Sequence, residues 1–199
     1  MKPGIQKWKH WTVNVLWYHY KIHILAGAFA AVVLAISIHS AVTRTEPDFI
    51  LFIASEQPVF DEQGSTLTAF FTERVEDAGH IAYQVANLNE PTQWQLIPVA
   101  LVNDQTVFLI VGESVARAMG DSGDLFYTAG ELGVRDAGPT AEMISLEGVP
   151  MMEELLFVFE PMYALIKRPV YDRRGGFYTP DSERRSALAA DSLRALLDG

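Results

Sequence analysis

The residues best suited to chemistry are the histidines, of which the chain has five. His19 and His23 are four positions apart, so a helix would place both imidazoles on one face, a spacing that metal sites use. His39 would lie about 24 Å further along the same helix, too far for one ion to bridge. A complete site would need ligands from another chain. The pattern therefore favours histidines in contact with water over a metal centre.

His80 is the one remaining histidine beyond the N-terminal part, so a Ser-His-Asp triad would have to use it. It follows Gly79 at the start of an expected strand, where an exposed structural role is typical. The neighbouring carboxylates of the chain do not share a helix face and make poor general acid–base pairs, which favours solvated charges. These acid pairs are Asp61-Glu62, Glu76-Asp77 and Glu153-Glu154.

Few other patterns point to chemistry. Asp121 and Asp124 could hold calcium, but the stretch around them lacks the EF-hand ligand pattern and its distal Glu. There is no Gly-rich phosphate loop and no Gly-x-Ser-x-Gly motif. The chain has no cysteine, which excludes thiolate nucleophiles and thiolate metal ligands. The sequence therefore predicts no catalytic, cofactor-binding or metal-binding residue and favours a protein that is not an enzyme.

The element that must position the rest of the chain is an uncharged stretch from Ile22 to Val42. As a helix it would span about 31 Å, the thickness of one hydrocarbon core. We therefore predict a transmembrane helix over residues 22–42. A buried core helix is one alternative, but such a helix rarely runs this long without a polar face. A cleaved secretory signal is the stronger alternative. Its best cleavage motif, Ala35-Ile36-Ser37, is a poor small-x-small site, so an uncleaved signal anchor is favoured.

Charge is divided sharply along the chain. Residues 1–42 contain four lysines and no acid, whereas residues 43–199 contain all 25 acids and have a net charge of −14. Basic residues beside a transmembrane helix stay in the cytoplasm, which predicts an N-terminus inside and a C-terminal domain outside. The acidic domain argues against a nucleic-acid partner, which would need clustered Lys and Arg. It should also stand off anionic lipid headgroups.

Two short segments flank the predicted span. Residues 1–21 are basic and aromatic, and Trp8, Trp11 and Tyr18 recur at helical spacing. This pattern favours an amphipathic interfacial helix over residues 5–21 rather than a simple aromatic belt. Residues 43–47 form a linker, since Pro47 cannot continue the helix.

Residues 48–199 have the length of one extracytoplasmic domain. Continuous apolar runs indicate strands buried on both faces, and capped periodic segments between them indicate helices. The order predicts an α/β fold, a small three-layer α/β domain with a mostly parallel sheet and right-handed crossovers. The expected strands are 48–55, 81–88 and 105–111, and the expected helices are 65–78, 91–103 (shortened by Pro98) and 114–119.

The pattern after residue 119 is weaker. Gly and Pro are frequent between residues 130 and 150, which indicates a region that is mostly loop. Early acids after Pro180 suit the start of a final helix over residues 181–197. The other expected features are a brief strand at 124–128, an edge pairing at 143–146, strands at 155–159 and 162–167, and a basic turn within 168–177.

Three stretches carry a resemblance to a known group. They are Trp17-Tyr18-His19-Tyr20-Lys21, the run from Pro47 to Ile53, and the run from Thr106 to Arg117. The chain resembles small single-pass envelope proteins of clostridia-like bacteria, whose outer domain is similar to one lobe of an extracellular solute-binding protein. The resemblance implies that the Val107–Val111 strand and the helix after it lie near a ligand cleft. A solute-binding protein closes two lobes on its ligand and this chain has room for one, so no binding residue is carried over.

Together these features predict a membrane-anchored, non-enzymatic binding or scaffolding protein of the cell surface, accessory to a transporter or envelope complex. Its expected partners are the lipid bilayer and either a membrane-protein complex or a small extracellular ligand, with no cofactor and no nucleic acid. Two alternatives stay open. One is a subunit of a larger membrane assembly packed through the transmembrane helix, and the other is a surface enzyme with an acidic site.

Overall fold

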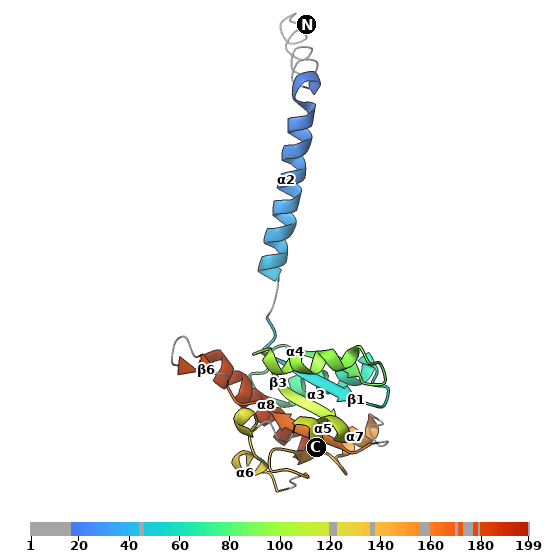
Figure 1. The fold of residues 1–199 in the computed structure, drawn as a ribbon. Helices are drawn as coiled ribbons and strands as arrows, with labels where there is room; N and C mark the ends of the chain where they lie inside the picture. The colour runs from blue at the N-terminus through green and yellow to red at the C-terminus, as the bar shows by residue number, and fades with distance from the viewer. Residues whose placement is uncertain are drawn as a thin grey trace, which may run out of the picture. The chain divides into compact units, whose positions relative to one another are not determined.

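The structure, a computed structural model, contains two compact units, Met1–Thr45 and Glu46–Gly199. Both are drawn in Figure 1. The structure describes residues 17–43, 46–119, 123–135, 138–155, 160–169, 171–172, 177–178 and 180–198.

The described part of the first unit is a helix of 27 residues, α2 (Trp17–Thr43). Its segment Tyr20–His39 has a mean hydropathy of 2.1 and exposed side chains. A helix this long and apolar can cross a membrane, which is compatible with anchoring, and a signal sequence shares these properties. The predicted span over 22–42 thus lies within a longer helix. Most of the predicted amphipathic helix over 5–21 lies outside the described residues.

The second unit is built on a five-stranded mixed sheet with the order β2-β1-β3-β5-β4. β2, β1 and β3 run parallel, while β5 is antiparallel to both of its neighbours. The predicted mostly parallel sheet is therefore only partly right, since parallel pairing holds for β2, β1 and β3 and fails at β5. The strands are β1 (Phe49–Ser55), β2 (Ile81–Asn87), β3 (Thr106–Gly112), β4 (Ile144–Ser145) and β5 (Met162–Ile166), with a separate pair of β6 (Tyr171–Asp172) and β7 (Phe177–Tyr178).

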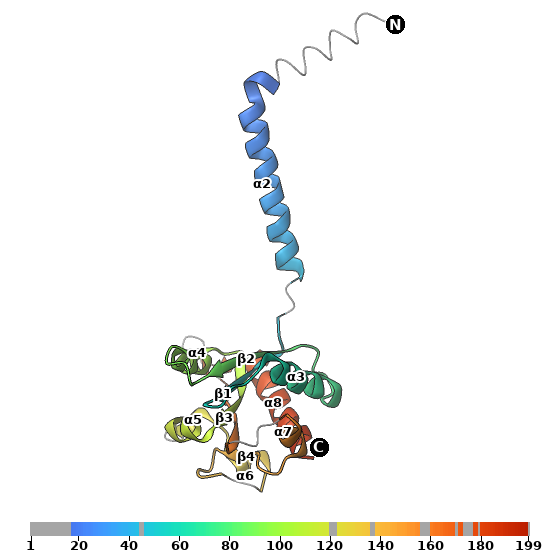
Figure 2. The ribbon, with the colours of Figure 1, turned by 90° about the vertical axis from the view of Figure 1, so that its right-hand side faces the viewer.

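Helices cover both faces of the sheet, which gives the predicted three layers (Figure 2). Alternate residues of β1 enter opposite cores: Leu51 and Ile53 face one side, and Phe52 and Ala54 the other. This double burial explains why β1 and β3 read as unbroken apolar runs. One face carries α3 (Asp61–Arg74), α6 (Ala129–Leu132), α7 (Pro150–Glu154) and α8 (Pro180–Asp198), and the other carries α4 (Leu96–Val102) and α5 (Glu113–Met119).

Two helices differ from their predicted bounds. α3 begins earlier than the predicted residue 65. It also ends earlier than residue 78, because the chain becomes extended at Val75 and buries Val75 and Ala78 in the core. α4 is shorter than residues 91–103, and a 3₁₀ turn, η2 (Gln93–Gln95), precedes it. Pro98 stands in the first turn of α4, where a missing N–H is tolerated.

The region after α5 is more structured than predicted. The expected strand at 124–128 is instead a 3₁₀ turn, η3 (Gly123–Leu125), followed by a single bridge between Phe126 and Lys167. The expected loop over 130–150 contains most of α6 and the first residue of α7. The expected edge pairing at 143–146 is confirmed, since β4 pairs with β5 at the edge of the sheet. Of the expected strand at 155–159, Leu155 is a turn residue and the rest lies outside the described residues.

Candidate binding site

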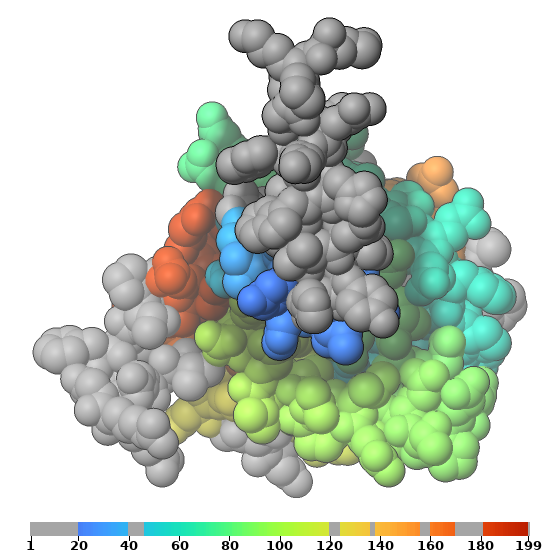
Figure 3. All heavy atoms as spheres, turned by 90° about the horizontal axis from the view of Figure 1, so that it is seen from above, coloured from blue at the N-terminus to red at the C-terminus, as the bar shows by residue number. Residues whose placement is uncertain are grey.

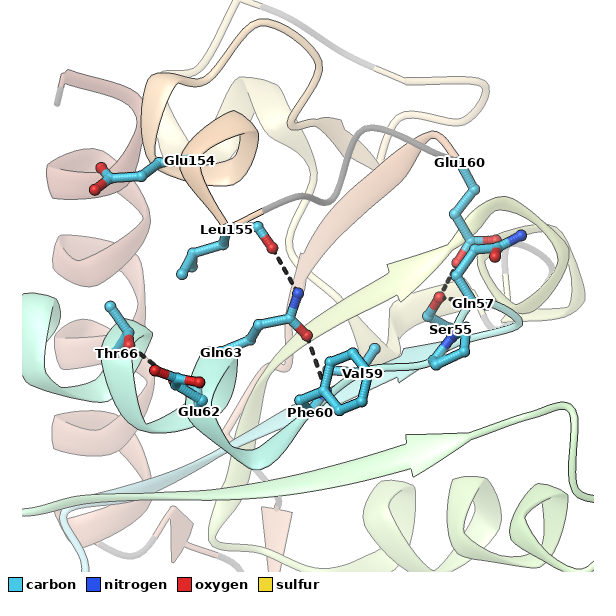
Figure 4. Close-up of a pocket in the computed structure, with 11 residues that line it drawn as sticks. Ser55, Gln57, Val59, Phe60, Glu62, Gln63, Thr66, Glu154, Leu155 and Glu160 are labelled. Atoms are coloured by element: carbon cyan, nitrogen blue, oxygen red, sulfur yellow. Dashed lines mark hydrogen bonds between the residues drawn. The ribbon is translucent and has the colours of Figure 1, made fainter.

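A cavity of about 540 Å³ opens at the carboxyl end of β1 (Figure 4). The chain passes from β1 to β2 on one side and then to β3 on the other, so its direction switches beside this end of β1. Open α/β sheets bind ligands at such switch points. The cavity is lined by Ser55, Gln57, Pro58, Val59, Phe60, Glu62, Gln63, Thr66, Glu154, Leu155 and Glu160.

A serine and a glutamate meet at the side of the cavity formed by the end of β1. Ser55, the last residue of β1, donates its hydroxyl hydrogen bond to Glu160 and accepts one from the Gln57 N–H at 2.8 Å. The Glu160 carboxylate lies against the last residue of β3, Gly112. A Cβ added at Gly112 would come within 2.7 Å of Glu160 Oε1. The glycine therefore leaves the space that this carboxylate occupies.

The end of β2 holds the loop that forms one wall of the cavity. Asn87 accepts a hydrogen bond from the Val59 N–H at 2.6 Å and donates its own amide to the Val59 carbonyl at 3.2 Å. The Asn87 N–H in turn donates to Gln93 Oε1 at 3.2 Å. Since one side chain satisfies both backbone groups of Val59, the loop after β1 is fixed to the neighbouring strand.

The start of α3 and the end of α7 form the opposite wall. Gln63 accepts a hydrogen bond from the Phe60 N–H at 2.9 Å, satisfying a free donor at the start of α3. Its amide group donates to the Leu155 carbonyl at 2.5 Å. Figure 4 shows Gln63 between these two partners. One side chain thus connects the two helices that border the cavity.

The cavity is acidic. Glu62, Glu154 and Glu160 contribute carboxylates, and no Lys, Arg or His is among the described residues that line it. Among the described residues, none of these three glutamates forms an ion pair. The remaining lining is apolar, from Val59, Phe60 and neighbouring side chains. A cationic group on a partly apolar ligand would complement this surface.

The histidines singled out from the sequence do not meet in this cavity. His23 and His39 are exposed on α2, and the His23 ring lies 6.3 Å from that of Tyr20. The His19 side chain is outside the described residues. His80 is exposed at the start of β2, and its N–H donates to Asp48 at 2.9 Å. Among the described residues, no group of three or more metal-ligating side chains occurs.

The acid pairs have mixed outcomes. Glu62 belongs to one acid pair and Glu154 to another, and both line the same cavity although they are far apart in the sequence. Glu76 and Asp77 are exposed after α3. Of the calcium candidates, Asp124 is exposed, and Asp121 lies outside the described residues.

Sequence reasoning missed Ser55, Gln63 and Glu160. One usable signal was present, because Ser55 and Asn87 end two strands expected to be parallel, and such ends share one edge of a sheet. Comparison of the chain with protein-family models, with curated proteins and with solved structures finds no match. Function is therefore inferred from the residues of the chain itself.

Proposed function

We propose that this chain is a membrane-anchored, non-enzymatic binding protein with its domain outside the cytoplasm, and that the cavity at the carboxyl end of β1 takes a small amine-bearing ligand. The observation that carries the proposal is the cavity itself, which opens at the switch point of the sheet and has three glutamates among its lining residues. The apolar helix α2 supports anchoring, and the lysines before it support an N-terminus in the cytoplasm. We also propose that the domain is similar to one lobe of a solute-binding protein, as the sequence suggested.

The ligand class follows from charge and shape. A carboxylate in a partly enclosed site needs a compensating donor or cation, and an ammonium group supplies both. Phe60 and Val59 offer apolar contact to a short hydrocarbon portion. An anionic ligand would meet a lining that contains three glutamates and, among the described residues, no basic side chain.

The test is calorimetric titration of the full chain in lipid nanodiscs with spermidine, and with citrate as the anionic probe. We expect heat of binding with spermidine alone. Glu160→Gln should weaken binding at least tenfold, since a hydrogen bond to a charged group is worth about 1.5–3 kcal/mol. The glutamine keeps an oxygen that can accept the Ser55 hydroxyl, so the local fold is retained.

Glu73→Gln provides the matched control, because Glu73 is an exposed glutamate of α3 that does not line the cavity. Its titration should equal that of the wild type. Equal weakening in both variants would mean that the net charge of the domain, not the cavity, attracts the amine. Binding of citrate in preference to spermidine would overturn the proposed ligand class.

The surface enzyme with an acidic site remains the second candidate, and the contact between Ser55 and Glu160 is the observation that favours it. A carboxylate beside a hydroxyl is the arrangement in which a base activates a nucleophile. Turnover of a bound ester of an amino alcohol, lost in Ser55→Ala, would support the enzyme. Binding without turnover supports the binding protein.

A further inference from the structure

The helix α4 is apolar on every side. Its seven residues are Leu-Ile-Pro-Val-Ala-Leu-Val, and within this fully described helix Ala100 alone is buried. Val99 is 59% exposed and Val102 is 84% exposed, and Trp94 in the preceding turn is 38% exposed. Figure 3 shows the lime-green atoms of the segment around α4 uncovered on the face that it presents.

One side of α4 is accounted for by the core. Leu96, Ile97 and Leu101 are partly buried and pack with Ala100 against the sheet. The other side consists of Pro98, Val99 and Val102. Surface helices normally carry polar residues on the face away from the core, and a helix that is apolar all round is normally covered on both sides. The outer side of α4 therefore has the composition of a contact surface.

α4 ends beside the start of β1, and only a short length of chain connects β1 to α2. The C-terminal end of α4 leads directly to β3, whose Thr106 pairs with Ile50 of β1, and the Gln105 carbonyl accepts the Ile50 N–H at 2.8 Å. β1 begins at Phe49 and α2 ends at Thr43. Fully extended, the chain from Thr43 to Phe49 reaches about 20 Å. The sheet edge at which α4 ends is therefore joined to α2 by a short tether.

Charge distinguishes α4 from the rest of the domain. The domain has a net charge of −14, which opposes contact with anionic headgroups, but residues 91–103 contain no charged side chain. Trp94 donates its indole N–H to the Leu88 carbonyl at 2.9 Å and keeps part of its ring in solvent. Tryptophan prefers the membrane–water interface.

We propose that the outer side of α4, formed by Trp94, Pro98, Val99 and Val102, lies in the headgroup region of the same bilayer that holds α2. This inference rests on the proposed anchoring. The tether keeps the bilayer at a high effective concentration, so a small apolar surface suffices for contact without a second protein. The acidic surfaces of the domain then stay in water while the uncharged helix α4 meets the lipid.

The test uses the absence of native cysteine to place one spin label at a time in the full chain, reconstituted in phosphatidylcholine vesicles. Val102→Cys and Val99→Cys report on α4. Glu73→Cys is the matched control, because it is exposed on α3 across the sheet. Collision rates with oxygen, which concentrates in lipid, and with a neutral nickel chelate, which stays in water, locate each label. We expect both α4 labels to favour oxygen at least threefold more than the Glu73 label does.

A fourth variant, Leu34→Cys on α2, separates failure of this inference from failure of anchoring. If the Leu34 label reads hydrocarbon while the α4 labels match Glu73, anchoring holds and the proposed contact of α4 is wrong. If the Leu34 label also reads water, the anchor is wrong and the α4 contact falls with it. Protection of the α4 labels from both reagents, with spin–spin broadening, would assign the surface to a second copy of the chain and would equally overturn the bilayer.

Discussion

Lys167 lies at the C-terminal end of α4 with none of its surface exposed. Its ammonium group donates to the carbonyls of Leu101 at 3.1 Å and Asn103 at 2.5 Å. A cation is favoured at a helix C-terminus, where carbonyls lack intrahelical partners. Burial nevertheless lowers the pKa of Lys167 to about 8, against a smaller opposing effect of Asp104.

This lowered pKa predicts a dependence of stability on pH. The folded chain holds the Lys167 proton less tightly than the unfolded chain, whose lysine pKa is 10.5, so unfolding takes up a proton between pH 8 and 10.5. Stability from this group must therefore rise with pH across that window. Relative to Lys167→Met, the wild type should gain about 1–3 kcal/mol in free energy of unfolding, measured by urea denaturation in detergent. If the free energies of unfolding of the wild type and Lys167→Met changed in parallel with pH, the Lys167 ammonium group would be hydrated in the folded chain.

Glu131 predicts a second rise of stability with pH, in the acid range. Arg168 contacts both of its carboxylate oxygens at 2.7 and 2.6 Å, and Thr128 donates its N–H at 2.8 Å. The hydrogen bond from Arg168, with those from Thr128, lowers the pKa of Glu131 from 4.5 to about 2. Its contribution is present above pH 4.5 and is lost as the pH falls towards 2.

The variant Glu131→Gln should therefore melt below the wild type at pH 7, and the gap in melting temperature should close between pH 4.5 and 2. Glu76→Gln is the control, since Glu76 is an exposed glutamate outside this contact. If the difference in melting temperature between Glu131→Gln and the wild type stayed constant into acid, the variant would be destabilised by altered hydrogen-bond geometry and not by the loss of the carboxylate charge.

At the scale of elements, α3 can pack closely against β2 because a glycine of α3 has no side chain. Gly64 is buried in α3, and a Cβ there would meet the Tyr83 ring of β2 at 2.5 Å. Gly64→Ala should improve helix propensity by about 1 kcal/mol and yet destabilise the domain, because overpacking typically costs about 1–3 kcal/mol. Gly130→Ala in α6, where nothing lies within 4 Å, should be neutral or stabilising. Thermal unfolding of both variants checks the contrast.

The same scale shows what sequence patterns could and could not predict. β1, β2 and β3 were predictable because central strands bury both faces and become continuous apolar runs. α6 was missed although the sequence carried its signature. Thr128 and Glu131 form a capping box, and Gly133 ends the helix with a φ of 73°. The ends of α3 were misplaced because core packing, not propensity, decides where Val75 leaves the helix.

At the scale of the whole molecule, the cavity could not be predicted from spacing. Glu62, Glu154 and Glu160 line one cavity because the chain returns through β5 beside β3, a pairing that the expected parallel sheet did not include. A pattern read along the chain identifies residues that share one helix or strand, and these three do not. The location of a site at the end of β1 was nevertheless predictable, because open parallel sheets bind ligands at the carboxyl ends of their strands.

The orientation of the chain in the membrane is the remaining prediction at this scale. The four lysines of residues 1–42 should keep the N-terminus in the cytoplasm and place Glu46–Gly199 outside. On intact cells making the full chain with a different epitope tag at each end, added protease should remove the C-terminal tag and spare the N-terminal tag. Absence of the N-terminal tag from the mature chain would mean that α2 is a cleaved signal.

The lysines supply the control for that experiment. Replacing Lys2, Lys7, Lys9 and Lys21 by glutamine removes the charge difference across α2 without changing the length of the apolar helix. If charge sets the orientation, a measurable share of these chains should insert inverted and protect the C-terminal tag. If the variant keeps the wild-type pattern, the folded acidic domain determines the orientation instead. Protection of both tags in the wild type would place the cavity in the cytoplasm and direct the search for its ligand there.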